Sequence, residues 1–199
     1  MSINVCNDRS MASITSLPSG VSGSSLVLLS EQTASSSATI DFTSDIDSTY
    51  KEYVFKYTNI HPETQSNFSF QVDTGTNTNY NQTITSTSYY AEHSEGDSSS
   101  LSYFAATDQA QGTGFQMISH NPGTDNDSNS SGVLHLFDPS NTTFVKHFIG
   151  DSNCTNGSAT SHRNFVAGYV NTTTALTRVR FKFASGNIDA GTIKMYGVV

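Results

Sequence analysis

Apolar and polar residues alternate with a period of two along most of the chain from residue 25 onward, a pattern typical of half-buried β-strands. The clearest example is the segment 176–185, LTRVRFKFAS, in which Val179, Phe181 and Phe183 fall on one face and the cationic residues on the other. Such segments predict sheets with one buried face and one face in water. The predicted strands are 25–31, 38–42, 51–60, 67–73, 81–93, 114–120, 132–138, 143–150, 164–171, 176–185 and 192–198.

Turn-forming residues separate these strands, and no segment shows helical periodicity over three turns. The segment 104–115, FAATDQAQGTGF, has room for one helical turn, which Gly112 interrupts. The polar stretches 94–100 and 151–164 are predicted as loops. The apolar segment 192–198 would fray at a loose end, so we expect it to lie inside a sheet. The pattern therefore predicts an all-β fold, an antiparallel β-sandwich that is jelly-roll-like.

The first 24 residues have a different composition and are predicted to form an extended N-terminal arm, followed by a sandwich domain over 25–199. The stretch SLPSGVSGSS resembles a flexible linker. We expect the arm to anchor the protein on a neighbouring subunit, and simple disorder is the alternative. The apolar residues that would make this contact are scattered without a strong period: Ile3, Val5, Met11, Ile14 and Leu17.

Composition and charge exclude two classes of partner. Only 13% of the residues are charged and the net charge is −8, whereas a protein that follows a nucleic-acid backbone needs a basic stripe. No apolar run approaches the roughly 20 residues that cross a bilayer, so we expect no membrane insertion. Cys6 and Cys154 are expected to be free thiols in a reducing cytosol, and a disulfide between them is the alternative.

Candidate metal sites fail on their spacing. The stretch that begins at Asp125 starts like a calcium loop, but Ser130 and Leu136 stand where that loop needs glycine and a carboxylate. A cation held in another way by 125–131 stays open. His135 and His147 lie on adjacent predicted strands and could meet across a hairpin, but two imidazoles do not make a zinc site.

No catalytic motif is present either. The chain has neither a nucleophile elbow nor a phosphate-binding glycine loop. Glu92 and Glu95 flank His93 in a polar region, and a solvated loop is the simpler interpretation of all three. We therefore expect no catalytic residues, no metal and no cofactor.

Exposed tyrosines are the remaining candidates for recognition. Sugar-binding sandwiches stack their ligand on an aromatic ring, most often that of tryptophan, which this chain lacks. Tyr89, Tyr90 and Tyr103 lie near predicted loops and would form a surface-recognition region; a place in the core or in an interface is the alternative.

The segment 36–64 carries a series of short motifs in a defined order. Phe42 ends a predicted strand, DSTY follows at 47–50, and Y-x-F-x-x-x-N-I-x-P follows at 53–62. In this order the motifs resemble virion proteins of marine tailed bacteriophages. Later segments resemble the closing half of the same family, so that the resemblance covers about residues 35–199 and leaves out the arm. These later segments are 134–148, 165–181 and 185–197.

The resemblance implies a non-enzymatic structural component on the outside of a virion, as capsid decoration, cement or part of a tail fibre. Its partners would be other capsid or tail subunits and further copies of itself, with a trimer expected by analogy. It would be made in the host cytoplasm and anchored through its arm. The alternative function is a glycan-binding adhesin at a tail-fibre tip, and a polysaccharide depolymerase with two close carboxylates is a third.

Overall fold

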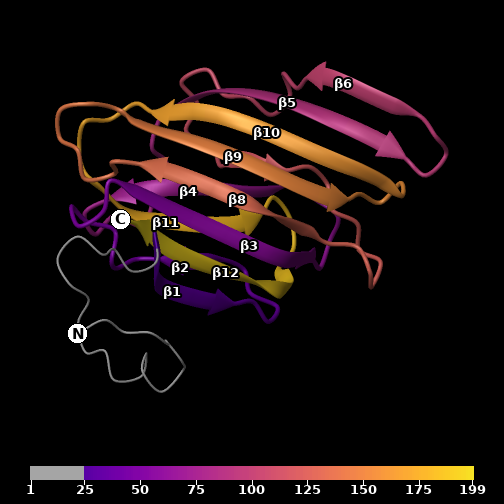
Figure 1. The fold of residues 1–199 in the computed structure, drawn as a ribbon, viewed down its shortest axis with the longest axis horizontal. Coiled ribbons are helices and arrows are strands. Elements are labelled where there is room, and N and C mark those ends of the chain that lie inside the picture. The colour runs from indigo at the N-terminus through magenta and orange to yellow at the C-terminus, as the bar shows by residue number, and fades with distance from the viewer. Residues whose placement is uncertain (1–24) are drawn as a thin grey trace, which may run out of the picture.

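The computed structural model describes residues 25–199, and these residues form two antiparallel sheets that pack face to face (Figure 1). The predicted all-β antiparallel sandwich is confirmed, and the described residues contain no helix, so 104–115 has no helical turn. The strands are β1 (Leu26–Thr33), β2 (Ile40–Phe42), β3 (Glu52–Pro62), β4 (Phe68–Thr74), β5 (Ile84–Ser94), β6 (Ser99–Tyr103), β7 (Gln116–Ser119), β8 (Ser130–Phe137), β9 (Lys146–Thr155), β10 (Thr160–Val170), β11 (Leu176–Phe183) and β12 (Ile188–Val198).

The strand order is that of a jelly roll with two added hairpins. The large sheet has the order β1-β12-β3-β8-β9-β10-β5-β6, and the small sheet has the order β2-β11-β4-β7. Without the hairpins β5–β6 and β9–β10, the remaining strands alternate between two four-stranded sheets as two Greek keys require. The hairpins pair with each other through β10 and β5, so they extend the large sheet on the side of β8.

The core of the jelly roll is aromatic. Phe181 lies at its centre, with its ring centroid 5.5–6.4 Å from those of Phe42, Phe55, Phe68 and Phe70. All five rings are buried. Each buried phenylalanine contributes roughly 1.5–3 kcal/mol through the removal of apolar surface from water. The period-two pattern of the sequence thus becomes a continuous apolar layer between the sheets.

The C-terminal strand lies inside the large sheet, as its apolar sequence predicts. β12 pairs with β1 on one side and with β3 on the other. Ile193 and Met195 are fully buried in the core. The strand therefore closes the sheet between the first and third strands of the chain.

The added hairpins pack partly through polar side chains, and there one loop prediction is largely wrong and one strand was not predicted. β9 and β10 run through most of 151–164. The apolar pattern missed them because their inward side chains there are polar yet buried, as at Ser152, His162 and Asn164. β6 begins at Ser99, within the last residues of the predicted loop 94–100, and was not predicted, because every one of its residues is exposed. Apolar alternation does not mark strands of either kind.

Two loops cover the outer face of the small sheet. Gln71 on β4 is buried and donates from Nε2 to the carbonyls of Gln82 (3.0 Å) and Gly114 (2.8 Å). The carboxylate of Asp73 accepts hydrogen bonds from the Tyr80 amide (2.8 Å) and from Gln82 Nε2 (3.1 Å). No described segment covers the outer face of the large sheet in the same way.

Candidate functional site

The outer face of the large sheet exposes apolar side chains from strand after strand. Ile149 on β9 is 50% exposed, Leu28 on β1 is 50% exposed and Leu101 on β6 is 73% exposed. Half-exposed apolar side chains lie between them. The apolar members of this outer face include Leu28, Val54, Tyr89, Leu101, Tyr103, Val133, Phe137, Ile149, Phe165, Tyr169 and Tyr196.

Two apolar hollows lie on this outer face. One, of about 630 Å³, lies over β3 and β8, where Val54 and Val133 line it together with Lys56. The other, of about 500 Å³, lies over β9 and β10, where Ile149 and Tyr169 line it. Apolar concave surface of this size is what a partner with protruding apolar side chains can fill.

A row of stacked groups crosses the outer face near β5. Arg163 makes a bidentate ion pair with Asp151, with N–O distances of 3.0 and 2.6 Å. Its guanidinium lies 4.4 Å from the ring centroid of Phe165, and that ring stacks on Tyr89 with centroids 4.7 Å apart. The row is therefore fixed in place by an ion pair at one end and by ring stacking at the other.

The three tyrosines that the sequence singles out do not lie together. Tyr89 and Tyr103 face each other across β5 and β6 and are 46% and 55% exposed. Tyr90 points to the opposite side, where it stacks on His162 with ring centroids 4.8 Å apart. The hydroxyl of Tyr103 donates to the Asp108 carboxylate, and this contact raises the pKa of Tyr103. The structure thus brings two of the three together on the surface.

The arm residues Ile3, Val5, Met11, Ile14 and Leu17 lie outside the described residues, as does Cys6. Cys154 is a buried free thiol whose S–H donates to the His120 carbonyl at 3.2 Å. Burial raises its pKa to about 11. Such a thiol is protonated at neutral pH and is a poor nucleophile.

The residues considered for metal binding and catalysis are separated. His135 Nδ1 lies 2.5 Å from Glu52 Oε1, whereas the ring of His147 packs against Tyr169. Glu92 lies 3.9 Å from His162, and His93 instead pairs with Asp97. Within 25–199 no group of three or more His, Cys, Asp or Glu side chains is arranged to hold a metal ion.

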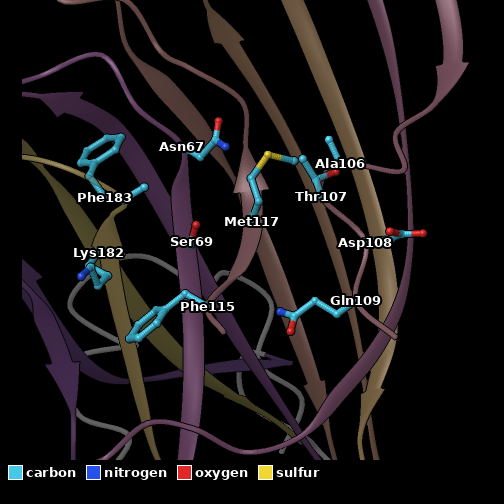
Figure 2. Close-up of a pocket in the computed structure, with 11 residues that line it drawn as sticks. Asn67, Ser69, Ala106, Thr107, Asp108, Gln109, Phe115, Met117, Lys182 and Phe183 are labelled. Carbon is cyan, nitrogen blue, oxygen red and sulfur yellow. The ribbon is translucent and has the colours of Figure 1, made fainter. Parts of the chain in front are cut away.

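A pocket of about 380 Å³ opens on the outer side of the small sheet. Figure 2 shows Ser69 and Met117 between two walls: Lys182 and Phe115 form one, and Thr107 and Gln109 form part of the other. Ser69 and Met117 are register partners on β4 and β7. Because the loop 104–115 folds back over this sheet, residues that are distant in the chain line one concavity.

The interior of the extension contains a pair of histidines that no spacing in the sequence signals. The rings of His120 and His162 lie with centroids 4.8 Å apart, and Phe104 packs edge-on against His120. Burial lowers the pKa of His120 to about 4 and also lowers that of His162. Nδ1 of His120 and Nδ2 of Asn164 are buried without a hydrogen-bond partner among the described residues.

No family model, no curated protein and no solved structure matches this chain. The described residues include no helix that could cross a membrane.

Proposed function

We propose that this chain is a non-catalytic structural subunit of a tailed-phage particle, located on its outside as capsid decoration, cement or part of a tail fibre. The resemblance of residues 35–199 to virion proteins gives the setting. The observation that carries the proposal is the outer face of the large sheet, because a structural subunit must present a surface on which its neighbours pack.

The outer face is suited to a protein partner. A monomer rarely exposes a contiguous apolar patch of more than a few hundred Å². Here apolar side chains extend from β1 across the sheet to β6, with the ordered pair of Arg163 and Asp151 among them. A mixture of apolar, aromatic and arginine side chains is typical of the cores of protein interfaces.

Charge substitutions on the outer face test this assembly role. Ile149→Lys places a charge in the middle of the face, and the residue is exposed enough for the chain to fold. Phe144→Lys is the matched control, because Phe144 is 68% exposed in the β8–β9 loop and is not part of the outer face. We expect Ile149→Lys to reduce the molar mass measured by light scattering, and Phe144→Lys to leave it unchanged. Equal masses for all three proteins would contradict the assembly role.

Location on the particle needs a separate test. An antibody against the purified protein would be applied to gradient-purified particles from a lysate in which the chain is expressed from the phage genome. Regular gold labelling of heads or tails is the expected result in electron microscopy. Recovery of all of the protein in the particle-free fraction would show that it is not a virion component.

Recognition of a host-surface glycan is the second candidate function. The pocket beside Phe115 favours it, because amide and hydroxyl groups line it together with an aromatic ring and a methionine. A glycan array probed with the full chain tests it. Signal above background for one set of glycans is expected, and a uniformly blank array would remove this candidate while leaving the structural role intact.

A further inference from the structure

We propose that the pocket lined by Ser69, Gln109, Phe115, Met117 and Lys182 binds a sugar residue that carries a carboxylate. This inference rests on the second candidate function, glycan recognition, and names the chemical class of the glycan. We call this concavity the Lys182 pocket.

The first step is the charge of the pocket. Most lysines and arginines among the described residues have an oxygen partner. Four pair with carboxylates, while Lys146 and Arg178 donate to backbone carbonyls. Among the described residues, the two remaining cations, Lys56 and Lys182, face an aromatic ring instead. The ammonium of Lys182 lies 5.4 Å from the Phe115 ring centroid, and it forms no ion pair with a described residue.

The carboxylate among the lining residues, that of Asp108, does not pair with the Lys182 ammonium. Figure 2 shows the Asp108 side chain directed away from Ser69 and Met117. The Asp108 carboxylate instead accepts a hydrogen bond from the Tyr103 hydroxyl. In a chain with a net charge of −8, an ammonium without a carboxylate in a concave site favours an anionic ligand.

The second step is the set of polar groups around the ammonium. Asn67 Oδ1 accepts the Asn121 amide at 3.2 Å, so its NH₂ group remains available as a donor. Gln109 donates from Nε2 to the Gly114 carbonyl at 3.1 Å, which leaves Oε1 as an acceptor. Ser69 is only 5% exposed, and its hydroxyl bonds to no described residue. A side-chain amide that is held by one hydrogen bond and keeps a second donor or acceptor free can bind the hydroxyl groups of a sugar.

The third step is size and apolar surface. A volume of about 380 Å³ is at the small end of the range for ligand pockets and accommodates a single sugar ring. Met117 and Phe115 supply apolar surface against which the C–H groups of the ring can pack. An acidic sugar would use all three features at once. Its carboxylate would pair with the Lys182 ammonium, its hydroxyls would hydrogen-bond to the amides of Asn67 and Gln109, and its ring would pack against Met117.

The test is a titration of the full chain with D-glucuronate, followed by nuclear magnetic resonance at physiological salt. We expect shifts confined to 67–69, 106–117 and 182–184, with a Kd of about 1 mM, as is usual for one small ligand on an open site. Glucose should bind at least tenfold more weakly because it lacks the carboxylate. Lactate should also bind at least tenfold more weakly because it lacks the ring.

Two matched variants separate the pocket from a general charge effect. Lys182→Gln keeps most of the side-chain stem and removes the charge, and it should weaken glucuronate binding at least tenfold. Lys56→Gln removes the other lysine that faces a ring, on the outer face of the large sheet, and should leave binding unchanged. Lys182→Gln should keep the molar mass of the unchanged protein, because Lys182 lies on β11 of the small sheet and is not part of the proposed assembly surface.

Four results would overturn the inference. They are no binding of glucuronate in the pocket, equal binding of glucose and glucuronate, equal binding of lactate, and equal effects of the two lysine variants. Equal binding of the two sugars in the Lys182 pocket would leave glycan recognition standing and remove only its acidic class. A chain that binds neither sugar here but is positive on the glycan array would recognise glycans elsewhere.

Discussion

At the scale of single residues, the described chain buries a few ionisable groups and gives each a specific environment. Lys146 is fully buried, and its ammonium donates to the carbonyls of Thr172 (3.0 Å) and Thr174 (2.8 Å) in the β10–β11 connection. His120 and His162 pack against each other and against aromatic rings. A buried ionisable group makes stability depend on whether its charge has partners.

The histidine pair predicts that stability falls in mild acid. Burial holds the pKa of His120 at about 4, below its ordinary value of 6.5, so the unfolded chain binds the proton more readily between these values. Stability is therefore fully present above about pH 6.5 and is lost as the pH falls toward 4. We expect a loss of about 1–2 kcal/mol in the free energy of unfolding, since one pKa unit corresponds to about 1.4 kcal/mol and partial exposure weakens the penalty.

Denaturant unfolding between pH 7.5 and pH 4 measures this effect. His120→Phe keeps a ring beside Phe104 and removes the titrating group, so its stability should change less with pH. His147→Gln, at an exposed position on the outer face, should keep the dependence of the unchanged protein. If His120→Phe and the unchanged protein lose the same amount, the histidine pair is not the cause.

Removal of the Lys146 ammonium should destabilise the fold. Lys146→Met keeps the length of the side chain but leaves the carbonyls of Thr172 and Thr174 without their donor. We expect the free energy of unfolding to fall by about 2–3 kcal/mol. Lys194→Met is the control, because it removes only a surface ion pair with Glu31 (3.3 Å) and should cost less than about 1 kcal/mol. Guanidinium unfolding of the two variants gives the comparison, and equal losses would contradict this role of Lys146.

At the scale of the elements, β12 forms hydrogen-bonded pairs with two neighbouring strands, β1 and β3. Its pairing with β3 shifts register around Ala190, and Gly191 there adopts a φ of +119°. A Cβ atom at Gly191 would lie 2.6 Å from the Asn59 carbonyl oxygen and 2.8 Å from the Ile60 Cα. The register shift therefore requires glycine at position 191, because only glycine adopts this dihedral angle easily and because a Cβ atom would clash with the backbone of β3.

Gly191→Ala should be much more harmful than Gly75→Ala. Both glycines have positive φ, but nothing lies within 4 Å of a Cβ built at Gly75. We expect about 1 kcal/mol of destabilisation at Gly75 from the dihedral angle alone. At Gly191 we expect roughly 2–4 kcal/mol, since the clash with backbone adds to the strain. Chemical denaturation of both variants measures the difference, and similar values would mean that the strand shifts to accept the methyl group.

At the scale of the whole molecule, the chain combines a jelly roll with an extension of different character. The jelly roll encloses most of the phenylalanine core. The added hairpins contribute Ile84, Phe148, Val166 and Val170 to that core, but elsewhere they pack over buried serine, asparagine and histidine side chains. β6 lies at the far edge of the extension (Figure 1). Its residues are exposed along its whole length. Polar packing buries less apolar area, so the extension is expected to be the less stable part.

Hydrogen exchange followed by mass spectrometry tests this gradient. Amides of β6 that pair with β5 should exchange through local opening, at rates independent of the denaturant concentration at low denaturant. Amides of β3, β11 and β12 should exchange only through global unfolding. The opposite order, or uniform protection across both sheets, would show that the extension and the jelly roll unfold as one unit.

Much of the fold could be predicted from local pattern. The alternation around Val179, Phe181 and Phe183 predicts β11, and the apolar end of the chain predicts that β12 lies inside a sheet. The prediction failed at β6 and in the parts of β9 and β10 that lie within 151–164. These strands face either water or a polar interior, so their residues carry no apolar period to read.

The candidate sites were less predictable than the fold. Tyr89 and Tyr103 could be identified as exposed aromatics, but the sequence could not show that Tyr90 points to the other side. The Lys182 pocket joins three strands and the loop 104–115, and no spacing along the chain marks it. Its residues meet only because that loop folds back over the small sheet.

By itself, the sequence determined the class of the fold, because side-chain alternation is a local property that fixes which face of each strand is buried. It also determined the net charge and the scarcity of charged residues. Tertiary structure alone decided the order of the strands, the extension of the large sheet by two hairpins, the pairing of His120 with His162 and the isolation of Lys182. These features depend on contacts between residues far apart in the chain, and only the packing of the two sheets brings them together.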